Sequence, residues 1–236
     1  MEITLDLEFV RAIVQGEYER ASNEIATHGV VPAYVASHQR HDQRLATAPD
    51  ASTLACRAGC SWCCHFSVDV RPVEAFRILA FMQREFDEER RNQVLEDVKA
   101  NRDVLHDLDD LERARRNVKC AFLLEGKCSI YAARPQMCRN YHATNAAGCE
   151  RAYLEPDNLE IDPEFAPYVY QAGGAHVDAF SKAMRDAGYD SRVYELNGAL
   201  IAALSQPDAL ARFEAKESPF AELHGWDVPP EFDEED

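Results

Sequence analysis

The sequence lacks both a long apolar run and a positively charged leader. No stretch approaches the roughly 18 apolar residues that a membrane-spanning helix requires. Glu2, Asp6 and Glu8 stand where a secretory signal would carry basic residues, and no apolar segment follows them. We therefore expect no association with a membrane and a cytoplasmic location.

Positive charge is also scarce. The 236 residues include 25 Lys and Arg against 42 Asp and Glu, which gives a formal net charge of −17. Such a chain repels nucleic acid and anionic membrane surfaces, so we expect neither as a partner. The arginines within 71–91 and 113–119 are interleaved with acidic residues, a pattern that predicts solvent-facing helix surfaces. The sequence identifies no protein partner.

The common catalytic motifs are missing as well. We find no Ser-His-Asp set, no glycine-rich phosphate loop and no H-E-x-x-H helix. The composition, 46% hydrophobic and 28% charged, is that of an ordinary globular domain, and the length suffices for a core. The sequence therefore favours a folded protein that is not an enzyme.

What the sequence does have is cysteine, gathered in two short segments. The first segment reads C-x3-C-x2-C-C, and the second spaces four cysteines at gaps of seven, nine and ten residues. Because cytoplasmic thiols stay reduced, we expect the cysteines to bind metal, with disulfides as the alternative. The candidate ligands are all eight cysteines: Cys56, Cys60, Cys63, Cys64, Cys120, Cys128, Cys138 and Cys149.

The spacing of these cysteines suits thiolate ligands. Cys60 and Cys63 have the C-x2-C spacing that lets two sulfurs approach one ion, and Cys56 lies one helical turn earlier. Cys64 cannot face the same way as Cys63, so the adjacent pair serves two sites or leaves one thiol spare. Four sulfurs around one ion make a closed zinc site, and an iron–sulfur cluster is the other common thiolate cofactor.

Several residues near the cysteines could bind metal, offset its charge or pack around the site. His65 and His142 could be ligands, but eight sulfurs suffice, so we expect both to support the site from outside. Arg134 and Arg139 flank Cys138 and could offset the negative charge of a four-thiolate site. We expect the nearby aromatic residues to pack over the cysteine module: Tyr131, Tyr141 and Trp62.

Apolar periodicity predicts a mainly α fold, a helical bundle around a loop-rich cysteine and metal module. In the N-terminal segment Phe9, Ile13 and Val14 follow helical spacing, and Pro32 is expected to mark a break. A helix that opens at Arg71-Pro72 and a second helix at 88–117 are expected to form an antiparallel pair, which returns the chain to the first cysteines. Further helices are expected at 134–141, 166–187, 192–204 and 207–216, and no strand ladder is expected.

The chain divides by composition into four segments. We expect an N-terminal helical segment at 1–50 and a cysteine-cluster metal-binding domain at 51–151. A C-terminal helical extension at 152–228 should pack on that domain. The last segment, 229–236, is acidic and is expected to be a disordered tail.

The block I-Y-x-x-R-P-x-x-C-R, from Ile130 to Arg139, together with C-x3-C-x2-C-C resembles the YkgJ-type cysteine-cluster family. The resemblance covers Cys56 to Cys149, and Ala121 departs from the proline that often follows the cysteine there. It implies a zinc- or iron-chelating domain. The module is also similar to that of flagellin lysine methylases, which implies a [4Fe-4S] cluster as an alternative. The spacing of the first three cysteines is also that of radical S-adenosylmethionine enzymes, but the helices expected downstream do not supply their β–α units.

Three hypotheses follow from these patterns. The favoured one is a non-enzymatic protein that binds zinc or iron for structure, storage or transfer. The alternatives are an iron–sulfur protein or enzyme and a metal-free protein with disulfides. We expect Cys60, Cys63 and Cys138 to be the strictest ligands, with Cys56 next, because Pro135 should orient the helix that carries Cys138.

Overall fold

The computed structural model describes residues 6–229 and confirms a mainly α fold. This part of the chain contains ten α-helices, and its strands are four two-residue segments in two small antiparallel ribbons. The predicted acidic tail, 229–236, lies outside the described residues except at its first position. No helix among residues 6–229 is long and apolar enough to cross a membrane.

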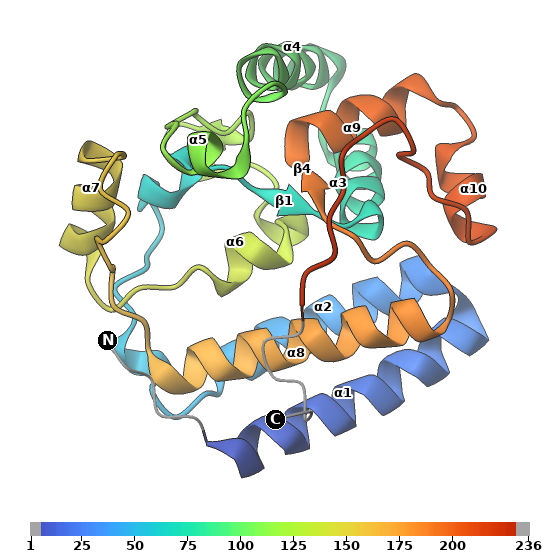
Figure 1. The fold of residues 1–236 in the computed structure, drawn as a ribbon, viewed down its shortest axis with the longest axis horizontal. Helices are drawn as coiled ribbons and strands as arrows, with labels where there is room; N and C mark the ends of the chain where they lie inside the picture. Colours follow the sequence, from blue (N-terminus) through green and yellow to red (C-terminus); the bar gives the residue numbers. More distant parts are fainter. Residues whose placement is uncertain (1–5, 230–236) are drawn as a thin grey trace.

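One layer of the fold consists of α1 (Leu7–His28), α2 (Val30–Ala46) and α8 (Pro167–Asp186). Helix α8 packs against both N-terminal helices, as Figure 1 shows, so segments far apart in sequence form one unit. Gly29, with a φ of 83°, separates α1 from α2. The predicted break at Pro32 is therefore wrong by three residues, because proline is tolerated in the first turn of a helix.

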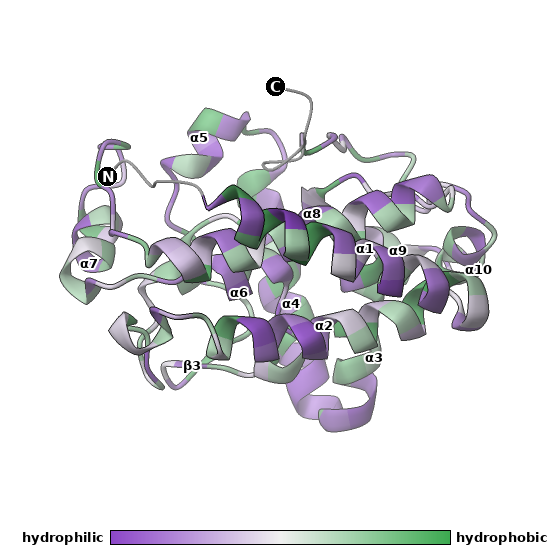
Figure 2. Ribbon diagram, turned by 90° about the horizontal axis from the view of Figure 1, so that it is seen from below, coloured by the Kyte–Doolittle hydropathy of each residue, from purple (hydrophilic) through white to green (hydrophobic). Residues whose placement is uncertain are grey.

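The contact between α1 and α8 depends on small side chains. Ala21 on α1 and Ala172, Ala175 and Ala179 on α8 are fully buried, which allows the two helices to approach closely. Figure 2 shows green and purple turns alternating along the helices of this layer, as expected of amphipathic helices. The prediction of a helix at 166–187 is confirmed.

The second layer consists of α3 (Pro72–Glu85), α4 (Glu88–Leu105), α9 (Leu196–Ser205) and α10 (Ala209–Glu214). The predicted direct antiparallel pairing of α3 with α4 is wrong, because α9 packs against both helices (Figure 1). Ala199 and Leu200 of α9 are fully buried in the same core cluster as Val98 of α4. The C-terminal part of the chain therefore completes the core of the central part.

The predicted helix at 88–117 is also wrong in its length. Helix α4 ends at Leu105, and α5 (Asp110–Ala114) begins after a turn. The carboxylate of Asp109 accepts the Glu112 N–H at 2.8 Å, and the carboxylate of Glu112 accepts the Asp109 N–H at 2.9 Å. This capping box starts a new helix where periodicity alone predicts continuation.

Pairs of two-residue strands occur beside the remaining helices and change where those helices begin. Strand β1 (Asp69–Val70) pairs with β4 (Tyr194–Glu195), so α9 begins later than the predicted residue 192. Helix α10 is likewise shorter than the predicted 207–216. The second cysteine segment contains two strands, a 3₁₀ turn and two helices: β2 (Leu123–Leu124), β3 (Lys127–Cys128), η3 (Tyr131–Ala133), α6 (Gln136–Asn140) and α7 (Ala146–Leu154).

The helix α6 confirms the prediction at 134–141, whereas α7 was not expected. The side-chain oxygen of Asn145 accepts the Ala147 N–H at 3.0 Å and caps α7. Two arginines predicted to face solvent are in fact buried, Arg71 and Arg113. Arg113 forms an ion pair with Asp69 at 2.9 Å. This arginine therefore connects α5 to β1 and does not face solvent.

Candidate metal centre

Backbone hydrogen bonds bring the two cysteine segments together. The Cys120 N–H donates to the Cys64 carbonyl at 2.8 Å, and the Val118 N–H donates to the His65 carbonyl at 2.9 Å. Cys63 and Cys64 lie on a 3₁₀ turn, η2 (Trp62–His65). The expectation that the two segments meet in space is confirmed.

Three cysteines of the second segment lie around the β2–β3 ribbon and α6, and we call Cys120, Cys128 and Cys138 the hairpin-side thiols. The Leu123 N–H donates to the Cys120 carbonyl at 2.9 Å, and Cys128 pairs with Leu123 across the ribbon. The ribbon turns at Gly126, whose φ of 73° favours glycine. This turn brings Cys128 back towards Cys120.

Three other cysteines lie on the side of η2 that faces α7, and we call Cys56, Cys60 and Cys149 the α7-side thiols. The Ala55 N–H donates to the Ala143 carbonyl at 2.8 Å, and the Cys56 Sγ lies 4.0 Å from the same carbonyl. Helix α7 packs against η2 and buries Cys149. Residues before Cys60 and after Cys138 therefore meet.

The hairpin-side thiols affect one another electrostatically. Burial, with a further contribution from Cys128 and Cys63, raises the pKa of Cys120 to about 11. Burial also raises the pKa of Cys138, with Cys120, Cys63 and Cys128 adding to the shift. A negative charge on one of these sulfurs therefore makes the others harder to deprotonate.

The α7-side thiols couple to each other and again to Cys63. Burial raises the pKa of Cys149 to about 11, with contributions from Cys56, Cys63 and Cys60. The pKa of Cys63 is raised first by its hydrogen bond with Cys64 and then by burial. Cys63 therefore influences the pKa of thiols in both sets.

The donor set fits a soft metal ion. All eight cysteines are free thiols, and no disulfide joins them. The pKa is raised for six of them, so these six favour the protonated form without a cation, and a bound metal reverses that preference: Cys56, Cys63, Cys120, Cys128, Cys138 and Cys149. As the side chains stand, no three His, Cys, Asp or Glu residues between positions 6 and 229 are grouped closely enough to hold an ion. A metal ion held by three or more of these side chains would require them to move closer together.

The structure groups the thiols differently from the set that spacing favours. Spacing favours Cys60, Cys63 and Cys138 with Cys56, whereas Cys138 interacts with the hairpin-side thiols. Cys56 and Cys60 interact with Cys149 instead. Cys63 is common to both groupings, and the ligand set stays a prediction.

The two histidines near the cysteines have different surroundings. The His65 Nδ1 lies 3.2 Å from the Ser61 carbonyl, and its ring contacts Tyr153 at 4.8 Å. The His142 Nδ1 is buried without a hydrogen-bond partner among the described residues. Burial, and then Arg134 and Arg139, lower the pKa of His142 to about 4. His142 is therefore a neutral imidazole with an unpartnered nitrogen, whereas His65 Nδ1 already has a carbonyl neighbour.

The aromatic residues pack around the module as expected, with one exception. Trp62 contacts Tyr153 at 5.3 Å, and Tyr141 contacts Phe66 at 5.8 Å. Tyr131 is 60% exposed, so it does not seal the module. Its ring instead supports the guanidinium of Arg134, whose Cζ lies 4.3 Å from the ring centroid.

Arg134 and Arg139, which flank Cys138 in sequence, have different surroundings. Arg139 is 1% exposed and donates to the His38 Nε2, to the Asp42 carboxylate and to the Tyr131 carbonyl, the last at 3.1 Å. Arg134 acts on the thiols: its positive charge opposes the burial that raises the pKa of Cys128. His38 and Asp42 on α2 were missed by the sequence reasoning, because nothing near them in sequence points to the cysteines.

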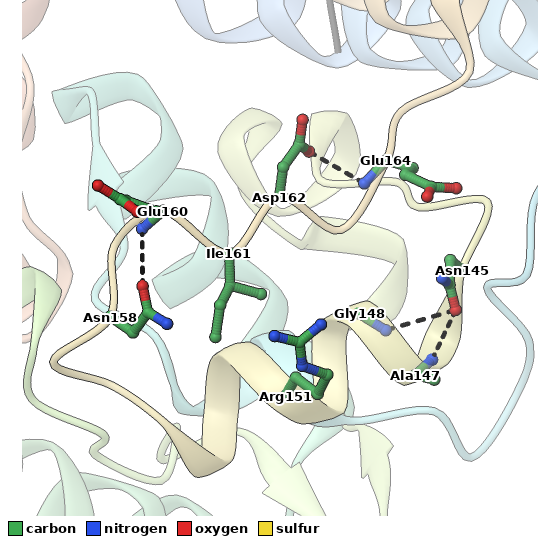
Figure 3. A pocket seen from close by; sticks show the side chains of 9 residues that line it. All are labelled: Asn145, Ala147, Gly148, Arg151, Asn158, Glu160, Ile161, Asp162 and Glu164. Carbon is green, nitrogen blue, oxygen red and sulfur yellow. Dashed lines mark hydrogen bonds between the residues drawn. The ribbon is translucent and has the colours of Figure 1, made fainter.

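A surface pocket of about 510 Å³ lies between α7 and the loop that follows it (Figure 3). Figure 3 shows the Arg151 guanidinium on the α7 side of this pocket and Glu160, Asp162 and Glu164 on the loop side. No cysteine lines it. A much smaller cavity, about 20 Å³, borders Cys120. The large pocket is therefore separate from the thiols.

The cysteine module matches a known protein family. Residues 55–162 match the family model CxxCxxCC, described as "Putative zinc- or iron-chelating domain". The match includes all eight cysteines and leaves α1, α2, α8, α9 and α10 outside. No curated protein matches the chain, and no solved structure matches it.

Proposed function

We propose that this chain, which carries a zinc- or iron-chelating domain of the CxxCxxCC family over residues 55–162, is a non-enzymatic protein that binds the metal through its cysteine thiolates. One observation carries the proposal. The Cys64–Cys120 backbone hydrogen bond joins two segments that are separated by 55 residues and together carry eight free thiols. Zinc and iron both accept soft sulfur ligands, four to a tetrahedral ion, so eight thiols suffice for one or two such sites.

The eight cysteines can form two sets of metal ligands. The hairpin-side thiols with Cys63 can supply four sulfurs, and the α7-side thiols can supply a second set with Cys63 or Cys64. The metal supplies positive charge that keeps the thiolates deprotonated and links the two segments. Each thiol that binds releases its proton to solvent.

A non-enzymatic role is supported by the space around the sulfurs. The cavity at Cys120, about 20 Å³, has room for about one water molecule and is too small for a substrate. The metal then either stabilises the fold or is stored or transferred by the protein. A cytoplasmic location agrees with eight reduced thiols, since such cysteines persist in reducing compartments.

The same thiols could bind a [4Fe-4S] cluster, which is the second candidate. The coupling of Cys63 to sulfurs on both sides favours it, because four cysteines drawn from both segments could surround one cluster. That arrangement would place the chain among iron–sulfur proteins or enzymes.

The deciding experiment is elemental analysis with a visible spectrum on the full chain purified without oxygen. We expect stoichiometric zinc or iron, with a colourless sample for zinc and a mononuclear iron–thiolate spectrum for iron. A brown sample with inorganic sulfide would replace the proposal with the cluster. A chain without metal, with eight titratable thiols after denaturation, would overturn both.

A further inference from the structure

Helix α7 and the loop that follows it lie at one edge of the molecule, apart from the helices of both layers, as Figure 1 and Figure 2 show. Of residues 145–163, the two that are buried are Cys149 and Pro163. None of these residues belongs to a hydrophobic core cluster of the described chain, 6–229. A segment that contributes so little to a core opens at a lower free energy than the core helices do.

The two ends of this segment meet at a closed base. The N–H and the hydroxyl of Thr144 both donate to the Glu164 carbonyl, at 2.9 Å and 3.3 Å. Within the segment α7 packs closely on the returning chain, since a Cβ at Gly148 would lie 2.9 Å from the Pro163 Cα. Residues 145–163 therefore form one compact loop on a fixed base, and we call them the α7 flap.

The Tyr153 side chain connects the α7 flap to the cysteine module. Its ring centroid lies 5.3 Å from that of Trp62 and 4.8 Å from that of His65. Trp62 and His65 are the first and last residues of η2, so Tyr153 contacts both ends of the turn that carries two of the cysteines. The Asn117 Nδ2 also donates to the Tyr153 carbonyl at 2.6 Å. The end of α7 is thus bound to the module by two ring contacts and a hydrogen bond.

The α7 flap carries one candidate ligand, and the other seven cysteines lie outside it. That ligand, Cys149, is the buried residue of α7, and α7 packs on η2, where Cys63 and Cys64 lie. The outer side of the same helix is open to solvent, with Arg151 64% and Leu154 65% exposed. A movement of the flap away from η2 therefore carries Cys149 away from the other thiols and opens the site to solvent.

We propose that the α7 flap is a lid over the metal centre, which opens without unfolding the core and lets metal enter and leave. This inference rests on the proposed function and adds to it the way in which the site is loaded and emptied. The contacts of Tyr153 with Trp62 and His65 keep the lid closed. Cys149 is the last thiol to bind the metal and the first to leave it. The metal is thereby exchangeable, which favours storage or transfer over a purely structural role.

The test is the rate at which the full chain, loaded with Zn²⁺, loses its metal to an excess of a chromogenic chelator. We expect Tyr153→Ala to raise this rate about tenfold, because it removes the two ring contacts that keep the lid closed. Tyr153→Phe should stay within about threefold of the wild type, since it keeps both contacts. Leu154→Ala is the control and should release Zn²⁺ at the wild-type rate, because Leu154 is the adjacent residue of α7 and is exposed.

Hydrogen exchange distinguishes opening of the lid from loss of the whole fold. In Tyr153→Ala the amides of α7 should exchange about tenfold faster than in the wild type, whereas those of α3 and α9 should keep their wild-type rates. Equal acceleration in all three helices would overturn the lid, because the metal would then leave through global unfolding.

The outcomes separate the two proposals. A wild-type chain that takes up neither Zn²⁺ nor Fe²⁺ overturns the proposed function and this inference with it. A wild-type chain that binds metal, with an unchanged release rate in Tyr153→Ala, overturns the inference alone. Should Tyr153→Ala fail to fold, Asn117→Ala serves instead, with a smaller expected rise of about threefold from the loss of one hydrogen bond. Wild-type release in that variant would also count against the lid.

Discussion

The buried guanidinium of Arg139 donates to the Nε2 of His38, and this contact joins the helix that carries Cys138 to α2. The contact links the matched domain to a helix outside it. Arg139 has one carboxylate partner, Asp42, and one carbonyl partner, Tyr131. It is therefore one of the residues that connect the three-helix layer to the cysteine module, beside the packing of α6 on α8.

The first prediction concerns this contact. We expect Arg139→Met to lower the free energy of unfolding by about 2 kcal/mol, because the His38 nitrogen and the Tyr131 carbonyl lose a buried donor. Urea denaturation measures the change. Arg151→Met is the control, since Arg151 is 64% exposed and its ion pair with Glu155 spans 3.8 Å. Equal stability of the two variants would contradict a structural role for Arg139.

The second prediction concerns the ligands. We expect Cys63→Ser to reduce the metal content per chain most, because Cys63 borders both sets of thiols. Cys60→Ser and Cys138→Ser should each lose one equivalent, whereas Cys64→Ser should keep its metal. Elemental analysis of each purified variant measures the outcome. Full metal retention by Cys138→Ser would move the ligand set towards Cys64 and Cys120.

The third prediction concerns the removal of metal. Chelation should lower the melting temperature and raise the number of reactive thiols, because the hairpin-side and α7-side segments contain few large apolar residues. A structural zinc site can contribute about 10 kcal/mol of apparent binding free energy. Thermal melts and thiol titration of treated and untreated protein provide the measurement. Unchanged melting would show that the fold does not need its metal.

The fourth prediction concerns acid. Burial, followed by Arg44 and Arg40, lowers the pKa of His176 to about 3. Because the unfolded chain takes up this proton below pH about 6.5, stability is present above that pH and is lost as the pH falls towards 3. The loss should approach about 1 kcal/mol per pH unit for this histidine. Urea denaturation of His176→Gln between pH 7 and pH 4.5 should show a shallower dependence than the wild type, and an equal slope would contradict the assignment.

The elements that the sequence predicted well are those with strong local signals. Pro72 and Pro167 mark the starts of α3 and α8, and the cysteine spacing located the module. The breaks at Gly29 and Asp109 depend on one glycine and one capping box, which periodicity does not detect. The Asn145 cap of α7 was a readable signal that was overlooked.

Other features depend on contacts between distant residues, which one sequence does not reveal. The position of α9 between α3 and α4 follows from the apolar surface that all three bury together, and helix periodicity carries no information about that choice. The roles of His38 and Asp42 arise only when α2 meets α6. Sequence reasoning identified Arg134 and Arg139 as a pair. Only the structure shows that Arg139 binds His38 and Asp42, whereas the guanidinium of Arg134 lies over the Tyr131 ring.

The position of α9 also has a consequence for the order of events during synthesis. Because α9 and β4 complete the core around α3, α4 and β1, the matched domain at 55–162 has an open core until residues near 205 have left the ribosome. Helix α8, which joins α1 and α2, also emerges late. We therefore expect metal to be captured after translation, by a nearly complete chain, rather than by the nascent cysteine segments.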